Sequence, residues 1–221
     1  MCFSPEADLV TGIVVSGVGL DAVRRCPQRR YLPLAALPLL LGLHQTVEAF
    51  AWWGMEGDLP APVGDTAAWL YLAIALVVVP FVVPAAIMSA EAARHRRARL
   101  FPFVVLGAAV AAALLPGLLN GGAEGEIACR YIAYDTGVGY GGYVAPFYVI
   151  AVCAPMLLSG SRRLLLFGLA NLAAVALLGW LLARGFISLW CVWAAVSSVV
   201  VNLEVRAAAR REVPVASEAP V

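Results

Sequence analysis

Lysine is absent from this sequence of 221 residues, so all fifteen basic residues are arginine. Without a lysine side chain the protein cannot form a Schiff base with retinal or pyridoxal phosphate. A phosphate-binding loop ending in Gly-Lys-Ser or Gly-Lys-Thr is excluded for the same reason. Retinal proteins, whatever their helix count, and nucleotide hydrolases of that type are therefore ruled out.

Charged residues of both signs are scarce. They make up 13% of the chain, whereas hydrophobic residues make up 62%. A soluble domain has about 25% charged residues. Several apolar runs reach roughly 20 residues, the length that a helix needs to cross a bilayer. These features predict a multi-pass protein of the bacterial inner membrane whose partner is the lipid bilayer, and nothing in the sequence indicates nucleic-acid binding.

The cysteines form no metal or redox motif that spacing alone reveals. None of the five lies in a CxxC pair or at zinc-finger spacing, so each is judged from its position in the predicted topology. The five are Cys2, Cys26, Cys129, Cys153 and Cys191. We expect Cys26 to be a free cytoplasmic thiol and Cys153 to be a small packing residue.

The apolar runs predict an all-α fold, a bundle of seven transmembrane helices. The predicted segments are about 7–23, 31–53, 67–88, 100–119, 144–158, 164–183 and 186–205. Residues 206–221 follow the last segment and are predicted to form a disordered cytoplasmic tail.

The arginines predict the orientation of the bundle in the membrane. Thirteen of the fifteen fall in alternate connections and in the tail. These are Arg24, Arg25, Arg29, Arg30, Arg94, Arg96, Arg97, Arg99, Arg162, Arg163, Arg206, Arg210 and Arg211. Because basic loops stay in the cytoplasm, the N-terminus is predicted outside and the C-terminus inside.

The second segment, 31–53, carries polar residues deep in an apolar run. His44 and Glu48 are four residues apart and therefore share one helix face, with Gln45 beside them. An ionisable pair in hydrocarbon is costly and normally faces a bundle interior or a wet cavity. This segment therefore holds the best candidate site in the sequence.

Depth brings two cysteines to the outer layer of His44, Gln45 and Glu48, and a third lies above it. At ~1.5 Å per residue, Glu48 lies about 7 Å and His44 about 13 Å inside the outer end of their helix. Cys191 lies about 7 Å below the outer surface in the last segment. Cys2 sits at that surface, and Cys129 lies in the outer loop above it.

Three interpretations of this layer stay open. Thiolate, imidazole and carboxylate groups could bind a metal ion or haem. Alternatively, removal of Met1 would leave Cys2 with a free α-amine beside its thiol, a nucleophile with its own base. In the third interpretation the layer is structural, with a disulfide from Cys2 to Cys191 or Cys129. Glu48 would then make a buried contact with His44 or an arginine.

Three functions follow from these alternatives. The first is a membrane-embedded sensor or enzyme with a thiol–carboxylate site in the outer layer, with or without a bound metal ion. The second is a small-solute or proton-coupled transporter that uses Glu48, since prolines interrupt the segments 67–88 and 144–158. The third is a receptor-like or structural bundle without chemistry. The long loop 120–143 is either a lid over the outer layer or an interfacial segment.

Three patches of the sequence resemble a single family. They are Met1-Cys2-Phe3-Ser4, Gln45-x-x-Glu48 with Trp52-Trp53-Gly54, and Ser188-Leu189-Trp190-Cys191-Val192-Trp193-Ala194-Ala195. The chain thus resembles a group of bacterial multi-pass membrane proteins known only as a domain of unknown function. The resemblance implies that Cys2, Gln45, Glu48 and Cys191 are family-type positions, whereas His44 stands where a second glutamine is expected. It implies no activity, cofactor or substrate.

Overall fold

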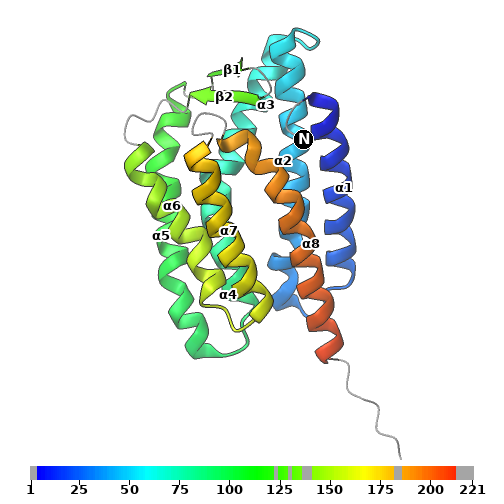
Figure 1. Cartoon of the computed structure of the whole chain (residues 1–221), viewed down its shortest axis with the longest axis vertical. Coiled ribbons are helices and arrows are strands. Elements are labelled where there is room, and N and C mark those ends of the chain that lie inside the picture. Colours follow the sequence, from blue (N-terminus) through cyan, green and yellow to red (C-terminus); the bar gives the residue numbers. More distant parts are fainter. Residues whose placement is uncertain (1–3, 122–123, 129–130, 136–140, 182–185, 213–221) are drawn as a thin grey trace, which may run out of the picture.

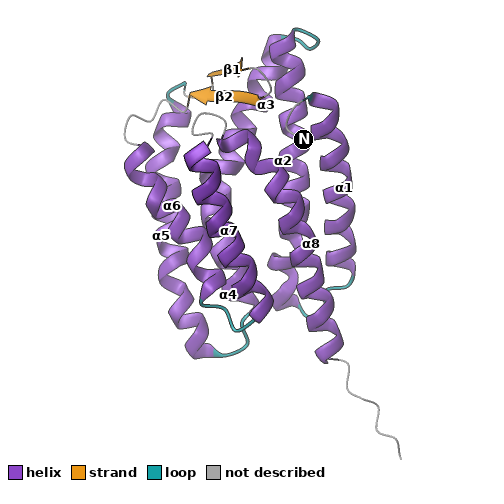
Figure 2. Cartoon of the chain, in the orientation of Figure 1, coloured by secondary structure: helices purple, strands orange, loops and turns teal. Residues whose placement is uncertain are grey.

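The computed structural model describes residues 4–121, 124–128, 131–135, 141–181 and 186–212. Within these residues the chain forms a bundle of helices that run side by side, with a short hairpin across one end (Figure 1; Figure 2). The elements are α1 (Pro5–Arg24), η1 (Arg29–Tyr31), α2 (Leu32–Glu56), α3 (Ala61–Ala73), η2 (Ile74–Val78), α4 (Val79–Ala90), α5 (Arg94–Leu119), β1 (Glu124–Ala128), β2 (Tyr131–Asp135), α6 (Gly141–Leu157), α7 (Arg162–Leu181) and α8 (Phe186–Glu212).

The predicted helical bundle is confirmed, because the described helices group into seven rods once α3, η2 and α4 are counted as one. Three of the rods are long and apolar enough to cross a membrane, namely Arg29–Glu56, Ala61–Ala90 and Arg94–Leu119. A shorter apolar helix covers Gly141–Leu157. These helices indicate a membrane protein, and the count of seven spans stays a prediction.

The structure differs from the predicted segments at the end of the last helix and adds regular structure within one predicted loop. The tail was expected to be disordered from residue 206, yet α8 continues to Glu212. Three alanines favour helix there, and Arg206 Nη2 donates to Asp21 Oδ2 of α1 at 2.7 Å, which anchors the extension. The loop 120–143 contains an antiparallel hairpin in which Ile127 pairs with Ile132. Its many glycines hid the two five-residue strands from the sequence analysis.

Helices α1 and α2 are antiparallel and pack closely through small residues. A Cβ on Gly12 would lie 2.9 Å from the Gly42 carbonyl oxygen, and a Cβ on Gly19 would lie 2.5 Å from the Leu39 amide nitrogen. Since real Cβ atoms do not approach so closely, glycine is required for this contact. Gly12 therefore faces the turn of Gly42 and Thr46, which fixes the register of the two helices.

The basic connections meet at the end of the bundle opposite the hairpin (Figure 1). Asp21 near the end of α1 binds Arg25 and Arg206, which joins the first helix to the last. Glu91, after α4, accepts a hydrogen bond from the Gly160 amide at 2.6 Å, which joins two further connections. The connections that carry most of the arginines therefore lie at one end of the bundle and are joined there in two places.

Candidate functional site

The polar residues of α2 lie inside the bundle. Glu48 is fully buried, Gln45 is 1% exposed and His44 is 5% exposed. All three come from one turn of a helix that is long and apolar enough to span a membrane. The helical periodicity that predicted a shared inward face therefore agrees with where the structure places them.

Asp8 of α1 joins this end of the bundle, and the sequence analysis missed it. Its side chain is 1% exposed and lies on the stripe that α1 turns toward its neighbours. Gly12 faces Thr46, so Asp8, one turn before Gly12, lies level with Phe50, close to the turn of Glu48. The sequence offered a signal, because Asp8 is in phase with the glycine stripe of α1.

His44 is held by an aromatic neighbour on α3. Its Nε2 lies 3.1 Å from the Tyr71 carbonyl oxygen, so this nitrogen carries the proton and donates it. The His44 and Tyr71 rings stack with centroids 4.1 Å apart and planes 7° from parallel. This arrangement fixes the orientation of the imidazole at the level of the cluster.

The hairpin covers the same region. The Tyr134 ring of β2 stacks on Tyr71 with centroids 5.1 Å apart. Ile132, 1% exposed, packs in one cluster with Trp52 of α2 and with Ala67 and Ala68 of α3. The described part of the loop therefore favours the covering alternative over a purely interfacial segment.

The thiols of the predicted site lie outside what the structure describes. Cys2 and Cys129 fall outside the described residues, and of Cys191 only the backbone, in α8, belongs to them. Among the described side chains no group of three His, Cys, Asp or Glu residues could hold a metal ion. The metal, thiol and disulfide interpretations of the outer layer thus stay predictions.

A second polar contact lies among α6, α7 and α8. Asn171, 2% exposed, donates to Cys153 Sγ at 3.3 Å and accepts from the Trp193 indole nitrogen. Cys153 is a buried free thiol, as expected of a packing residue, and Cys26 is also free, whereas its cytoplasmic location stays a prediction. Asn202 donates to the Val18 carbonyl oxygen at 2.9 Å, so it ties α8 to α1. These contacts join α6 to α7, α7 to α8 and α8 to α1, so they serve packing.

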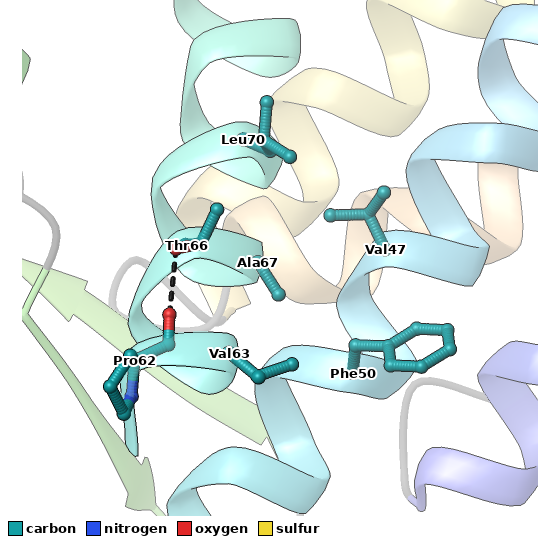
Figure 3. A pocket seen from close by; sticks show the side chains of 7 residues that line it. All are labelled: Val47, Phe50, Pro62, Val63, Thr66, Ala67 and Leu70. Carbon is teal, nitrogen blue, oxygen red and sulfur yellow. Dashed lines mark hydrogen bonds between the residues drawn. The ribbon is translucent and has the colours of Figure 1, made fainter. Parts of the chain in front are cut away.

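An apolar groove opens between α2 and α3 on the outside of the bundle (Figure 3). It is lined by Val47, Phe50, Pro62, Val63, Thr66, Ala67 and Leu70. The Thr66 hydroxyl donates to the Pro62 carbonyl oxygen at 2.6 Å, so it offers no donor to an occupant. The groove is therefore unsuited to a polar ligand, and its apolar lining differs from the polar side chains around Glu48.

The long apolar helices suggest a membrane protein, and they enclose a cluster of buried polar side chains. The chain belongs to the family of unknown function DUF6629, whose model matches residues 1–218. The resemblance drawn from the three sequence patches is thereby confirmed. Searches of curated proteins and of solved structures found no match.

Proposed function

We propose that the chain is a seven-span protein of the bacterial inner membrane that acts as a sensor or enzyme through a thiol–carboxylate site. The observation that carries this proposal is the complete burial of Glu48 in a helix apolar enough to span the bilayer. Burying a carboxylate there costs several kcal/mol unless it is paired or put to use, and intramembrane carboxylates are typically functional.

In this site Cys2 and Cys191 join Glu48 in the outer half of the membrane. Their thiols supply the reactive groups, and Glu48 either accepts a thiol proton or shares a metal ion with the thiolates. His44 is oriented by Tyr71, and the hairpin shields the cluster from outside water. Shielding strengthens electrostatic interactions among the buried groups.

Alkylation kinetics test the coupling of Glu48 to the thiols. Glu48→Gln keeps the shape of the side chain and removes its ionisable group, and we expect the alkylation rates of Cys2 and Cys191 to change about threefold or more. Glu56→Gln is the matched control, because Glu56 is exposed at the end of α2. Equal rates in both variants, with melting temperatures unchanged, would remove Glu48 from the thiol site.

Orientation is tested with a native cysteine. Cys26 is half-buried beside the basic connection, where its thiol donates to the Gln28 carbonyl oxygen at 3.1 Å. We expect a membrane-impermeant maleimide to label it only after the cells are permeabilised. Labelling of Cys26 in intact cells would reverse the proposed topology.

A transporter is the second candidate, and the π-helical turn η2 favours it. The turn interrupts the rod Ala61–Ala90 in its middle, and interrupted helices often line transport sites. In proteoliposomes a transporter of this kind would show solute or proton flux that Glu48→Gln abolishes. Flux that is indifferent to this substitution would count against it.

A further inference from the structure

The start of α5 carries four arginines and His95, and only some of these side chains make contacts within the described part of the protein. Arg97 Nε donates to the Glu91 carbonyl oxygen at 2.6 Å, and its Nη2 lies 3.5 Å from the Ser89 carbonyl oxygen. Arg96 Nη1 lies 3.9 Å from Glu91 Oε2. These two arginines hold the connection between α4 and α5 and are turned toward it.

Two arginines and the histidine of the same helix start make no polar contact within the described part of the chain and are available to an outside partner. Arg94, His95 and Arg99 are exposed, and within the described part of the chain they take part in no hydrogen bond or ion pair. A patch of unpaired positive charge attracts anionic groups. The positive charge of these side chains is therefore not neutralised by other groups in the described part of the chain.

The patch stands in line with the outward apolar surface of α5. Phe101 and Val105 follow Arg94 at helical spacing and are 56% and 52% exposed. Arg94 lies about 10 Å along the helix axis from Phe101. Pro102, exposed, follows His95 and Arg99 on the adjoining stripe in the same way. Positive charge thus sits where the headgroup of a lipid on this surface would lie.

We infer that Arg94 and Arg99, with His95 between them, bind the phosphate of an anionic phospholipid whose acyl chains lie along the stripe of Phe101 and Val105 and the adjoining stripe of Pro102. The inference rests on the proposed membrane position and adds a specific lipid partner to it. Arginine suits this role because its planar guanidinium binds phosphate oxygens in pairs. Each basic residue near a membrane surface contributes appreciably to the attraction of anionic lipid.

The test is a titration of the full chain in neutral detergent with phosphatidylglycerol or with phosphatidylcholine of the same acyl chains. Native mass spectrometry counts the retained lipid, and thermal unfolding measures its effect. We expect selective retention of phosphatidylglycerol that weakens about tenfold or more in Arg94→Gln/Arg99→Gln. Arg210→Gln, an exposed arginine near the end of α8, is the matched control and retains selectivity.

Three results would overturn the inference. Equal retention of both lipids shows that charge is not recognised, and selectivity unchanged in the double variant places the lipid elsewhere. Protection by soluble glycerophosphate equal to that by phosphatidylglycerol shows a site for free phosphate.

An alkaline wash of membranes tests the membrane position separately. Release of the protein would overturn both proposals, whereas lost selectivity in retained protein counts against this one alone.

Discussion

His44 donates a hydrogen bond from Nε2 to the buried Tyr71 carbonyl oxygen at 3.1 Å. Phenylalanine at position 44 would keep the ring stack and leave that buried oxygen without the imidazole donor. We expect His44→Phe to lower the free energy of unfolding by about 1–2 kcal/mol. Thermal unfolding in detergent measures the loss, and His95→Phe, at an exposed position, should change nothing. Identical melting of both variants would contradict the assigned contact.

Gly107 and Gly17 give opposite results for the same substitution. A Cβ on Gly107 would overlap the Pro80 carbonyl oxygen of α4, whereas no atom lies within 4 Å of a Cβ on Gly17. Gly107→Ala should therefore push α5 from α4 and lower stability by about 1–3 kcal/mol. Gly17→Ala should be neutral or stabilising by up to about 1 kcal/mol, because alanine favours helix. Melting curves of the pair decide, and equal shifts would refute the close approach.

At the scale of residues, the sequence predicts the orientation of side chains that recur with helical spacing along one helix. The period that placed His44, Gln45 and Glu48 on one face agrees with their burial in the structure. Tyr71 and Tyr134 were missed because their contacts join residues distant in sequence, which no local period records. What the cluster does is decided by such contacts, so its role stays a proposal.

Tyr148 supplies a hydrogen-bond donor at the π-helical turn η2 of the rod Ala61–Ala90. In a π-helical turn the proline at position 80 lacks the N–H that would reach the Ala75 carbonyl oxygen, and the Tyr148 hydroxyl donates to that oxygen at 2.7 Å. Tyr148→Phe should cost about 1 kcal/mol in the wild type. In a Pro80→Ala background, where the N–H returns, the cost should shrink.

Thermal unfolding of the four proteins in this double-mutant cycle measures whether the effect of Tyr148→Phe depends on Pro80. Tyr143→Phe is the control, since Tyr143 is 81% exposed. A cost of Tyr148→Phe that is the same with and without Pro80 would show that the hydroxyl does not replace the missing donor.

The hairpin offers a matched pair of isoleucines that face each other across its strands. Ile132 is 1% exposed, whereas its partner Ile127 is 40% exposed. We expect Ile132→Ala to lower stability by about 2–4 kcal/mol and Ile127→Ala by well under 1 kcal/mol. Limited proteolysis between α5 and α6 checks the location of the effect. Cleavage should rise only in Ile132→Ala, and equal cleavage in both would mean that the hairpin does not cover the cluster.

At the scale of elements, long apolar runs predicted the helices, because each such run is both long enough to form a helix and apolar enough to be buried. The hairpin escaped because a two-stranded unit in a glycine-rich loop draws its stability from packing on α2 and α3. The extension of α8 escaped for a similar reason, since Arg206 is fixed by Asp21, far away in the sequence. Local composition carries neither contact.

At the scale of the whole molecule, the charge pattern predicted that the basic connections share one side. The structure gathers them at one end, where Asp21 joins α1 to α8 and Glu91 joins two connections. Which helices are neighbours could not be predicted, because several arrangements satisfy the same pattern. Seven spans, orientation and the bacterial inner membrane remain proposals, and Cys26 labelling tests the orientation directly.

The most direct measurement for the whole account is the intact mass of the detergent-purified chain, alkylated with and without reductant, together with elemental analysis and a visible spectrum. The thiol–carboxylate site predicts that Cys2 and Cys191 are alkylated without reductant, or are protected by a bound metal ion found in the same sample. A mass that rises on reduction, with Cys2 joined to Cys191 or Cys129 and no metal present, would contradict it. The outer layer would then be structural.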